Sequence, residues 1–171
     1  MASWAYTPTF RGFQSHFGFY NGATDYWAHT HPEKSPSSPL DMHWASTPGV
    51  PATPVTDRNG SLTKNLSDYG AFLFARQTNA VIDAHVAAAA QANGASSPPP
   101  PLFLYLTHQS VHEPLQAPAE YVAKFTHVKD ENRRTFCGML AALDDAVYDV
   151  TSHMESLSLW QDTLFVFHAD K

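Results

Sequence analysis

Pro101-Leu-Phe-Leu-Tyr-Leu-Thr-His-Gln-Ser-Val-His-Glu-Pro114 is the stretch that decides the fold of this 171-residue chain. Its first half is an unbroken apolar run of residues with high β-propensity, which predicts a strand over 102–107 buried on both faces, as in a parallel sheet. His108 and His112 follow the end of that strand. Because ligands of open α/β sheets gather beyond the carboxyl ends of strands, the stretch predicts a site as well as a sheet.

The sequence that follows predicts the rest of a β-α-β unit. Pro118 suits the start of a short helix over 118–125, and apolar residues at three- and four-residue steps predict an amphipathic helix over 130–157. A second buried strand is expected over 163–167. Right-handed crossovers make two such strands parallel, so their carboxyl ends share an edge. The side chains expected to converge there are those of His108, His112, His168 and Asp170.

The chain before this unit has three different compositions. Residues 1–31 are rich in glycine and aromatic side chains, and the aromatic cluster at 10–27 favours packing over a sugar-binding platform. Residues 32–66 hold six prolines and predict a long surface loop or insertion rather than a core element. A helix is expected from a cap at Ser67 or Asp68 to a stop at Gly94.

Composition excludes several classes of protein. Hydrophobic residues make up 43% of the chain, which indicates a folded globular protein, and 171 residues suit one domain or part of a larger one. The formal net charge of −6 and the absence of a basic cluster argue against nucleic acid and anionic membranes as partners. No apolar run reaches transmembrane length, and no signal peptide is visible at the N-terminus. The sequons at Asn59 and Asn65 are candidate glycosylation sites and hint at a secretory origin.

Each candidate chemical residue has an alternative interpretation. The His108-x-x-x-His112 spacing could bind zinc. An imidazole at this place is better suited to donating a hydrogen bond to an anionic oxygen or to protonating a leaving group. Both residues could also be ordinary loop histidines. Asp170 could bind a hard cation or be a solvated carboxylate. Cys137, the single cysteine, fits a buried inert thiol better than a nucleophile. His29 and His31 could bind metal, although solvated histidines are commoner.

Several blocks resemble the type I sulfatases, in particular the arylsulfatase B-like branch. They are Thr7-Pro-Thr-Phe-Arg-Gly-Phe13, Phe17-Gly-Phe-Tyr-Asn-Gly22, the stretch from Pro101 to Pro114, Asp130-Glu-Asn-Arg-Arg134 with Leu143-Asp-Asp-Ala-Val147, and Leu159 to Phe167. The blocks occur in the family's order and cover most of the chain outside 32–66 and the alanine-rich stretch.

The resemblance implies an α/β fold, namely part of an alkaline-phosphatase-like sulfatase domain with a mixed or parallel central sheet and flanking helices. It also implies hydrolysis of sulfate esters, such as those on sulfated glycans, in a lysosomal or secreted protein. In that family a cysteine of a C-x-P-x-R motif becomes formylglycine and calcium holds the sulfate. By that analogy His112 would bind the sulfate ester and assist the leaving oxygen, and Asp170 would be a calcium ligand.

The chain departs from the family pattern at the nucleophile. It contains no C-x-P-x-R, Cys137 stands in another context, and Lys171 follows Asp170 where the family continues Asp-Asn-Gly-Gly. We therefore expect an internal fragment of the catalytic domain, with an incomplete calcium site and no activity alone. Two alternatives are a non-catalytic remnant that binds sulfated glycans and a phosphodiesterase relative on the same fold.

Overall fold

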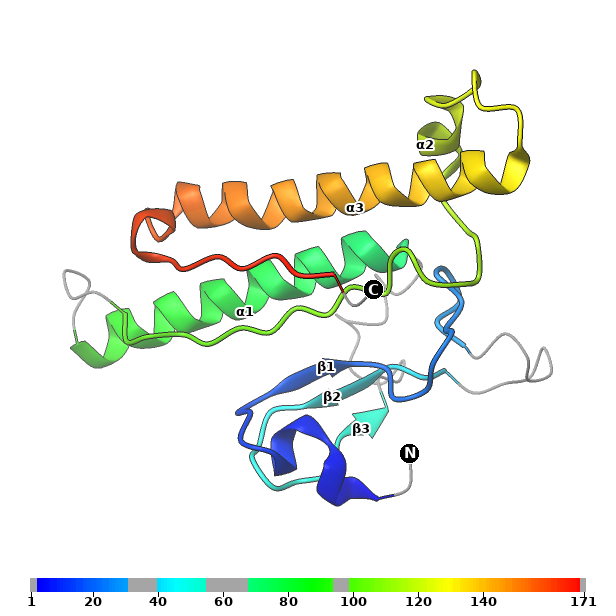
Figure 1. Cartoon of the computed structure of the whole chain (residues 1–171). Helices are drawn as coiled ribbons and strands as arrows, with labels where there is room; N and C mark the ends of the chain where they lie inside the picture. Colours follow the sequence, from blue (N-terminus) through cyan, green and yellow to red (C-terminus); the bar gives the residue numbers. More distant parts are fainter. Residues whose placement is uncertain (1–2, 31–39, 55–67, 94–98, 170–171) are drawn as a thin grey trace.

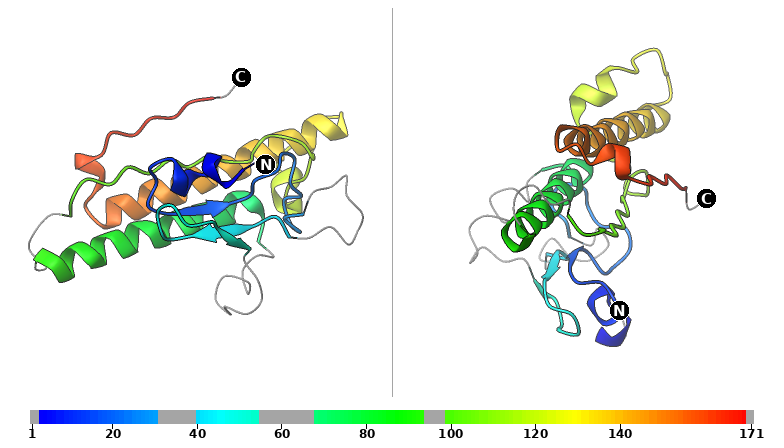
Figure 2. Two further views of the ribbon diagram at one scale, coloured as in Figure 1. Left: turned by 90° about the horizontal axis from the view of Figure 1, so that it is seen from below. Right: turned by 90° about the vertical axis from the view of Figure 1, so that its left-hand side faces the viewer.

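A computed structural model of the chain describes residues 3–30, 40–54, 68–93 and 99–169. Two long helices, α1 (Gly70–Asn93) and α3 (Glu131–Ser156), lie against each other, and α2 (Ala119–Ala123) covers the start of α3. A small sheet lies on the far side of α1 from α3 (Figures 1 and 2), so α1 is the middle layer. Among the described helices, none combines the length and apolar character that a membrane crossing needs.

Helix α3 forms largely as its sequence predicts. The Asp130 carboxylate accepts a hydrogen bond of 2.7 Å from the Arg133 amide and caps the helix. One face of the helix is buried against α1, through a cluster to which it contributes Met139, Ala142, Ala146 and Val150. At Gly138 an added Cβ would come within 3.1 Å of the Val122 backbone nitrogen, so the missing side chain lets α2 pack closely.

Helix α1 buries two faces because it lies between two layers. Ala71, Ala75 and Ile82 belong to the cluster shared with α3, whereas Leu73 and Phe74 pack with Met42 on the side of the sheet. The helix begins later than predicted, at Gly70, and the Tyr69 carbonyl accepts the first amides. The alternative cap Ser67 and the predicted stop at Gly94 lie outside the described residues.

The prediction of a surface loop over the whole of 32–66 is wrong for its central part. β2 (His43–Ala45) pairs antiparallel with β1 (His16–Gly18) and with β3 (Thr53–Pro54), in the order β1-β2-β3. Met42, next to β2, is completely buried. A short apolar segment between prolines is therefore sufficient for a strand when a neighbouring strand and the helix α1 cover it.

The two predicted parallel strands are extended but unpaired. Residues 101–109 and 163–169 carry no strand assignment, and no backbone hydrogen bond joins the two segments within the described chain. Their direction nevertheless agrees with a β-α-β unit, since both segments run opposite to α1 and α3 (Figure 1). A buried strand needs a hydrogen-bonded neighbour on each side, and the described residues supply none.

Candidate functional site

The loop that carries His112 follows the first extended segment and bridges to α2. The His112 amide donates to the Gln109 carbonyl at 3.0 Å, which closes a turn. The imidazole is exposed, and its Nδ1 lies 2.9 Å from the Glu113 carbonyl oxygen. Because a carbonyl only accepts, Nδ1 carries the proton of this hydrogen bond. That tautomer leaves Nε2 as the nitrogen for an external partner.

Tyr26 fixes the turn from the opposite side. Its buried hydroxyl donates to the carbonyl oxygens of Gln109, at 3.1 Å, and His112, at 2.9 Å. Burial, with a smaller contribution from Tyr69, raises the pKa of Tyr26 well above its usual value, so it stays a donor. The His112 backbone is thus held by a neutral group 86 residues away in sequence.

Gln116 ties the other end of the loop to the same N-terminal segment. Its side-chain oxygen accepts from the Tyr26 amide at 2.8 Å, and its nitrogen donates to Asp25 at 2.6 Å. Burial disfavours the Asp25 carboxylate, but hydrogen bonds from Gln116 and two backbone amides outweigh it and lower the pKa of Asp25. The Tyr69 hydroxyl donates to the Gln116 carbonyl at 2.9 Å.

His108 and Gln109, the first loop residues, face a dry interior. Gln109 is buried and its side-chain nitrogen donates to the Thr24 carbonyl. Both ring nitrogens of His108 are shielded from solvent and have no hydrogen-bond partner among the described residues. Burial therefore lowers the pKa of His108 to about 4. His108 is therefore a neutral, enclosed side chain at neutral pH, whereas the side chain of His112 is exposed.

The other predicted site residues are only partly placed. His168 is exposed on the second extended segment. Asp170, Asn59, Asn65 and His31 lie outside the described residues, so the predicted approach of His112 to Asp170 stays a prediction. The expectation of a solvated His29 is wrong, because its side chain is buried and its Nε2 lies 3.2 Å from the Asp68 carbonyl oxygen.

The described residues do not fit calcium or a formylglycine nucleophile. No group of three histidine, cysteine, aspartate or glutamate side chains is placed to hold a metal ion in the part of the chain that the structure describes. Cys137 is half-buried on α3, in the sequence Phe136-Cys-Gly-Met-Leu140, where no C-x-P-x-R motif exists. The described residues therefore assign neither a calcium site nor a formylglycine nucleophile.

A second polar cluster, which the sequence analysis did not find, lies beside the sheet. The Tyr20 ring stacks on His16, with centroids 5.1 Å apart, and lies 4.7 Å from the His43 ring. Asp41 approaches His43 Nδ1 at 3.3 Å and accepts from Asn21. Burial is the main cause that lowers the pKa values of both histidines.

The arrangement of the helices and extended segments indicates the class of protein to which the chain belongs. Two parallel helices are followed by extended apolar segments that run back in the opposite direction, and the first of these leads into a fixed histidine loop. This is a piece of an α/β domain whose polar loop lies beyond the end of a strand-like segment.

Comparisons with known proteins identify the family. The sulfatase family model matches residues 2–171, and the chain therefore belongs to the sulfatase family. Arylsulfatase J of Mus musculus is 26% identical over 164 residues, which cover 95% of this chain and 23% of that protein. The match confirms the sulfatase resemblance, while the arylsulfatase B-like branch stays a prediction.

Solved structures confirm the fold class, a partial alkaline-phosphatase-like α/β fold. The crystal structure of Ps i-CgsB in complex with k-i-k-neocarrahexaose matches with a TM-score of 0.65 and 20% identity, over 92% of this chain and 32% of that one. The structure of Ps i-CgsB alone matches with the same TM-score and 21% identity. The chain thus spans about a quarter to a third of the relatives it matches.

Proposed function

We propose that the chain is a sulfate-recognising part of a sulfuric ester hydrolase, with His112 as the residue that contacts the sulfate ester. Family membership supports the class of reaction. The observation that carries the role of His112 is its placement: an exposed imidazole on a loop whose backbone is fixed by Tyr26, Tyr69 and Gln116. In the proposed catalytic domain, which would include residues 1–171, an imidazolium at His112 would donate through Nε2 to a sulfate oxygen and protonate the leaving oxygen.

A sulfated glycan is the proposed substrate class. The match to a protein solved with a carrageenan-type hexasaccharide supports it. A lysosomal or secreted location and glycosylation at Asn59 and Asn65 are proposed on the same basis. Asp170 is proposed as a ligand for calcium in a site that other residues must complete, because calcium takes six to eight oxygen ligands.

The 171-residue chain itself is proposed to bind without turnover. It lacks the C-x-P-x-R motif, and its described residues hold no metal-binding group. Incubation of the pure chain with an aryl sulfate is expected to release no sulfate. Measurable turnover would contradict this proposal and would require a nucleophile that the family analogy does not supply.

Calorimetric titration with a sulfated carrageenan oligosaccharide tests the binding proposal. Replacement of His112 by alanine removes a charge-assisted hydrogen bond, so binding is expected to weaken by roughly tenfold or more. His127→Ala is the matched control, because His127 is also exposed but lies beyond α2. Equal affinities of the wild type and His112→Ala would rule out a site centred on His112. A desulfated oligosaccharide is expected not to bind.

A further inference from the structure

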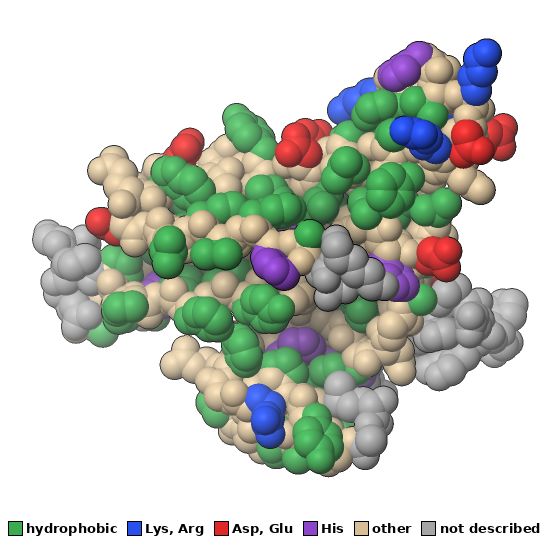
Figure 3. All heavy atoms as spheres, viewed as in Figure 1, with side chains coloured by type: hydrophobic (Ala, Val, Ile, Leu, Met, Phe, Trp, Pro, Cys, Tyr) green, Lys and Arg blue, Asp and Glu red, His purple; other side chains and the backbone are tan. Residues whose placement is uncertain are grey.

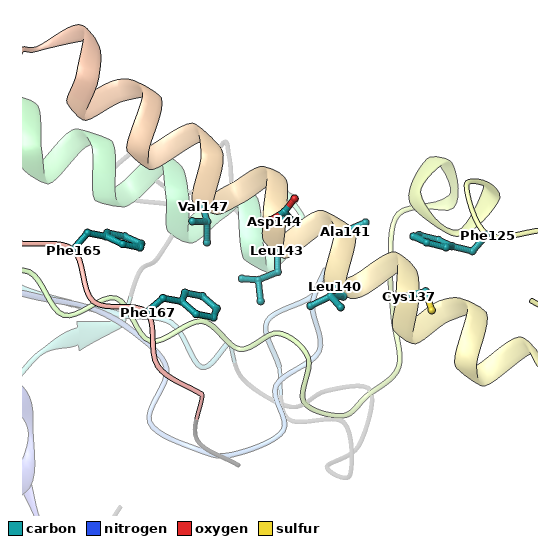
Figure 4. Close-up of a pocket in the computed structure, with 9 residues that line it drawn as sticks. All are labelled: Phe125, Cys137, Leu140, Ala141, Leu143, Asp144, Val147, Phe165 and Phe167. Atoms are coloured by element: carbon teal, nitrogen blue, oxygen red, sulfur yellow. The ribbon is translucent and has the colours of Figure 1, made fainter. Parts of the chain in front are cut away.

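The apolar hollow along α3 holds few polar groups. Phe165 and Phe167 lie opposite Leu143 and Val147 across it (Figure 4), and Asp144 is the charged side chain among the described residues that line it. Hydrophobic side chains also cover much of the surrounding face in Figure 3. Ligand sites combine apolar walls with several convergent polar groups. In this chain such groups converge instead beneath the histidine loop, residues 108–116.

The buried side chain of Gln109 joins the start of that loop to the N-terminal segment. Its Nε2 donates a hydrogen bond to the carbonyl oxygen of Thr24, a completely buried residue 85 positions away in sequence. Because a carbonyl oxygen only accepts, this contact also determines which arm of the amide is the nitrogen. Oε1, on the other arm, lies against Gly70, the first residue of α1.

Gly70 leaves the space that this oxygen occupies. A Cβ added at Gly70 would stand 3.2 Å from Gln109 Oε1, 3.5 Å from the Tyr26 ring and 3.7 Å from the Tyr26 carbonyl oxygen. The backbone of Gly70 does not itself require glycine, because its φ lies outside the left-handed region. Glycine also weakens a helix relative to alanine. Glycine at this position therefore meets a need for space rather than for backbone freedom.

The same oxygen lies beside the positive end of a 24-residue helix. Gln109 Oε1 is shielded from solvent and has no hydrogen-bond partner among the described residues. The first amides of a helix lack intrahelical acceptors, and their partial positive charges attract an acceptor oxygen. The start of α1 thus offsets part of the cost of burying Oε1.

The backbone of Gln109 connects these contacts to His112. The Gln109 carbonyl oxygen accepts from the His112 amide at 3.0 Å and from the Tyr26 hydroxyl at 3.1 Å. The side chain and the carbonyl of one residue are therefore both held by distant parts of the chain. A displaced Gln109 side chain would move the carbonyl that closes the turn, and the His112 imidazole with it.

We propose that Gln109 is a positioning residue for His112 and that Gly70 provides the socket for its side-chain amide. Gln109 does not touch the ligand; it determines where the imidazole stands by holding the turn from Thr24 and from α1. This inference rests on the proposed function, in which His112 contacts a sulfate ester. The atoms concerned are buried among the described residues, so no further segment is needed to complete their contacts.

Calorimetric titration of the 171-residue chain with a sulfated carrageenan oligosaccharide tests the proposal with two variants. Gln109→Met keeps the length of the side chain but removes the donor to Thr24, so binding is expected to weaken roughly threefold to tenfold. Gly70→Ala keeps Gln109 but narrows its socket, and a smaller loss of roughly twofold is expected. The matched controls are Gln161→Met, at an exposed position, and Gly22→Ala, where an added Cβ meets nothing within 4 Å. Both controls should bind like the wild type.

The double variant Gly70→Ala/Gln109→Ala distinguishes a socket from an ordinary glycine at a helix start. Once the amide is absent, the added methyl group displaces nothing. Gly70→Ala should therefore lower the affinity of the wild type but not that of Gln109→Ala. Equal losses in both backgrounds would overturn the socket.

Two measurements distinguish the positioning of His112 from a general effect on stability. The His112 amide of Gln109→Met should exchange its hydrogen faster than in the wild type, relative to the amides of α3, without any ligand. The ring-nitrogen resonances of His112 should also shift less in this variant when the oligosaccharide is added. If Gln109→Met is less stable in urea but keeps the wild-type affinity, His112 exchange and ring shifts, the positioning role is wrong.

His112→Ala separates a failure of this inference from a failure of the proposed function. Weaker binding by His112→Ala together with unchanged binding by Gln109→Met would overturn the positioning role and leave the function standing. Unchanged binding by His112→Ala would overturn the proposed function. In that case faster exchange of the His112 amide in Gln109→Met would still support the hold on the turn, and unchanged exchange would overturn it as well.

Discussion

The rings of Tyr26 and Tyr69 are stacked, with their centroids 5.0 Å apart and their planes 13° apart. Each hydroxyl reaches a different part of the histidine loop: Tyr26 the carbonyls of Gln109 and His112, and Tyr69 the carbonyl of Gln116. Burial raises the pKa of Tyr69 to about 12, so both groups remain neutral donors in the physiological range. The stacked pair therefore holds the loop at both ends.

Tyr26→Phe should loosen the loop without changing the core. The substitution keeps the ring stacking but leaves two loop carbonyls without their donor, so a loss of about 1–2 kcal/mol in the free energy of unfolding is expected. Urea denaturation measures it. Tyr6→Phe, which removes an exposed hydroxyl, should change stability by less than about 0.5 kcal/mol. Equal effects of both variants would mean that the Tyr26 hydroxyl does not hold the loop.

Stability should decrease in mild acid because of His108. Its folded-state pKa of about 4 lies below the ordinary value of 6.5, so the unfolded chain binds the proton more readily. The contribution is complete above pH 6.5 and is lost as the pH falls towards 4, by at most about 3 kcal/mol at 1.36 kcal/mol per pKa unit. His108→Leu should flatten the dependence of unfolding free energy on pH in this window. His127→Leu should not, and an unchanged slope in His108→Leu would contradict the assignment.

The acid sensitivity should have a second source near the sheet. His16 and His43 both have lowered pKa values, mainly through burial, so their protonation also favours unfolding as the pH falls below 6.5. His43→Gln is expected to reduce this loss of stability, and thermal unfolding at two pH values on either side of 6 measures it. If the variant and the wild type lose the same stability, His43 is not a source of acid sensitivity.

The packing between α1 and α3 should depend on Met139 and hardly on its neighbour. Met139 is completely buried, so Met139→Ala is expected to cost about 2–5 kcal/mol through lost burial and a cavity. Leu140→Ala, one position along the same helix, removes a side chain that is half exposed and should cost much less. Chemical denaturation of both variants distinguishes the two positions. A larger loss for Leu140→Ala would contradict the packing described here.

Gln116→Ala should weaken the connection between the loop and the N-terminal segment. The substitution removes the acceptor for the Tyr26 amide and the donor to Asp25, so a loss of about 1–3 kcal/mol is expected. Gln161→Ala is the matched control at an exposed position and should be close to neutral. Protease resistance of the loop, measured beside unfolding, should fall in the first variant only.

Local patterns predicted the helices well and the loop's surroundings poorly. Residues 130–157 carry a repeating apolar face and a capping aspartate, so α3 could be identified within a residue of each end. By contrast, β2 lies among prolines, and its stability comes from β1 and Phe74 rather than from its own sequence. The apolar runs 102–107 and 163–167 predicted buried strands, but both segments are largely exposed and unpaired in the described chain. Only their direction agrees with the prediction, because pairing depends on neighbours that a local pattern does not contain.

The sequence predicted a candidate site but not the groups that support it. The position of His112 after an apolar run predicts a ligand at this loop, and that role stays a proposal. The partners of its backbone, Tyr26 and Gln109, are 83 residues apart, and no spacing rule links them. Nothing in the local sequence distinguishes Tyr26 from the other aromatic residues of 1–31.

The distance in sequence between the loop and its supports has a consequence for how the molecule assembles. Helical turns form from neighbouring residues within microseconds, whereas contacts between residues 26 and 112 require a large part of the chain to be gathered first. The histidine loop should consequently acquire its final shape late in folding, after α1 and α3 have docked. A kinetic intermediate would thus contain formed helices and a histidine loop that has not yet acquired its geometry.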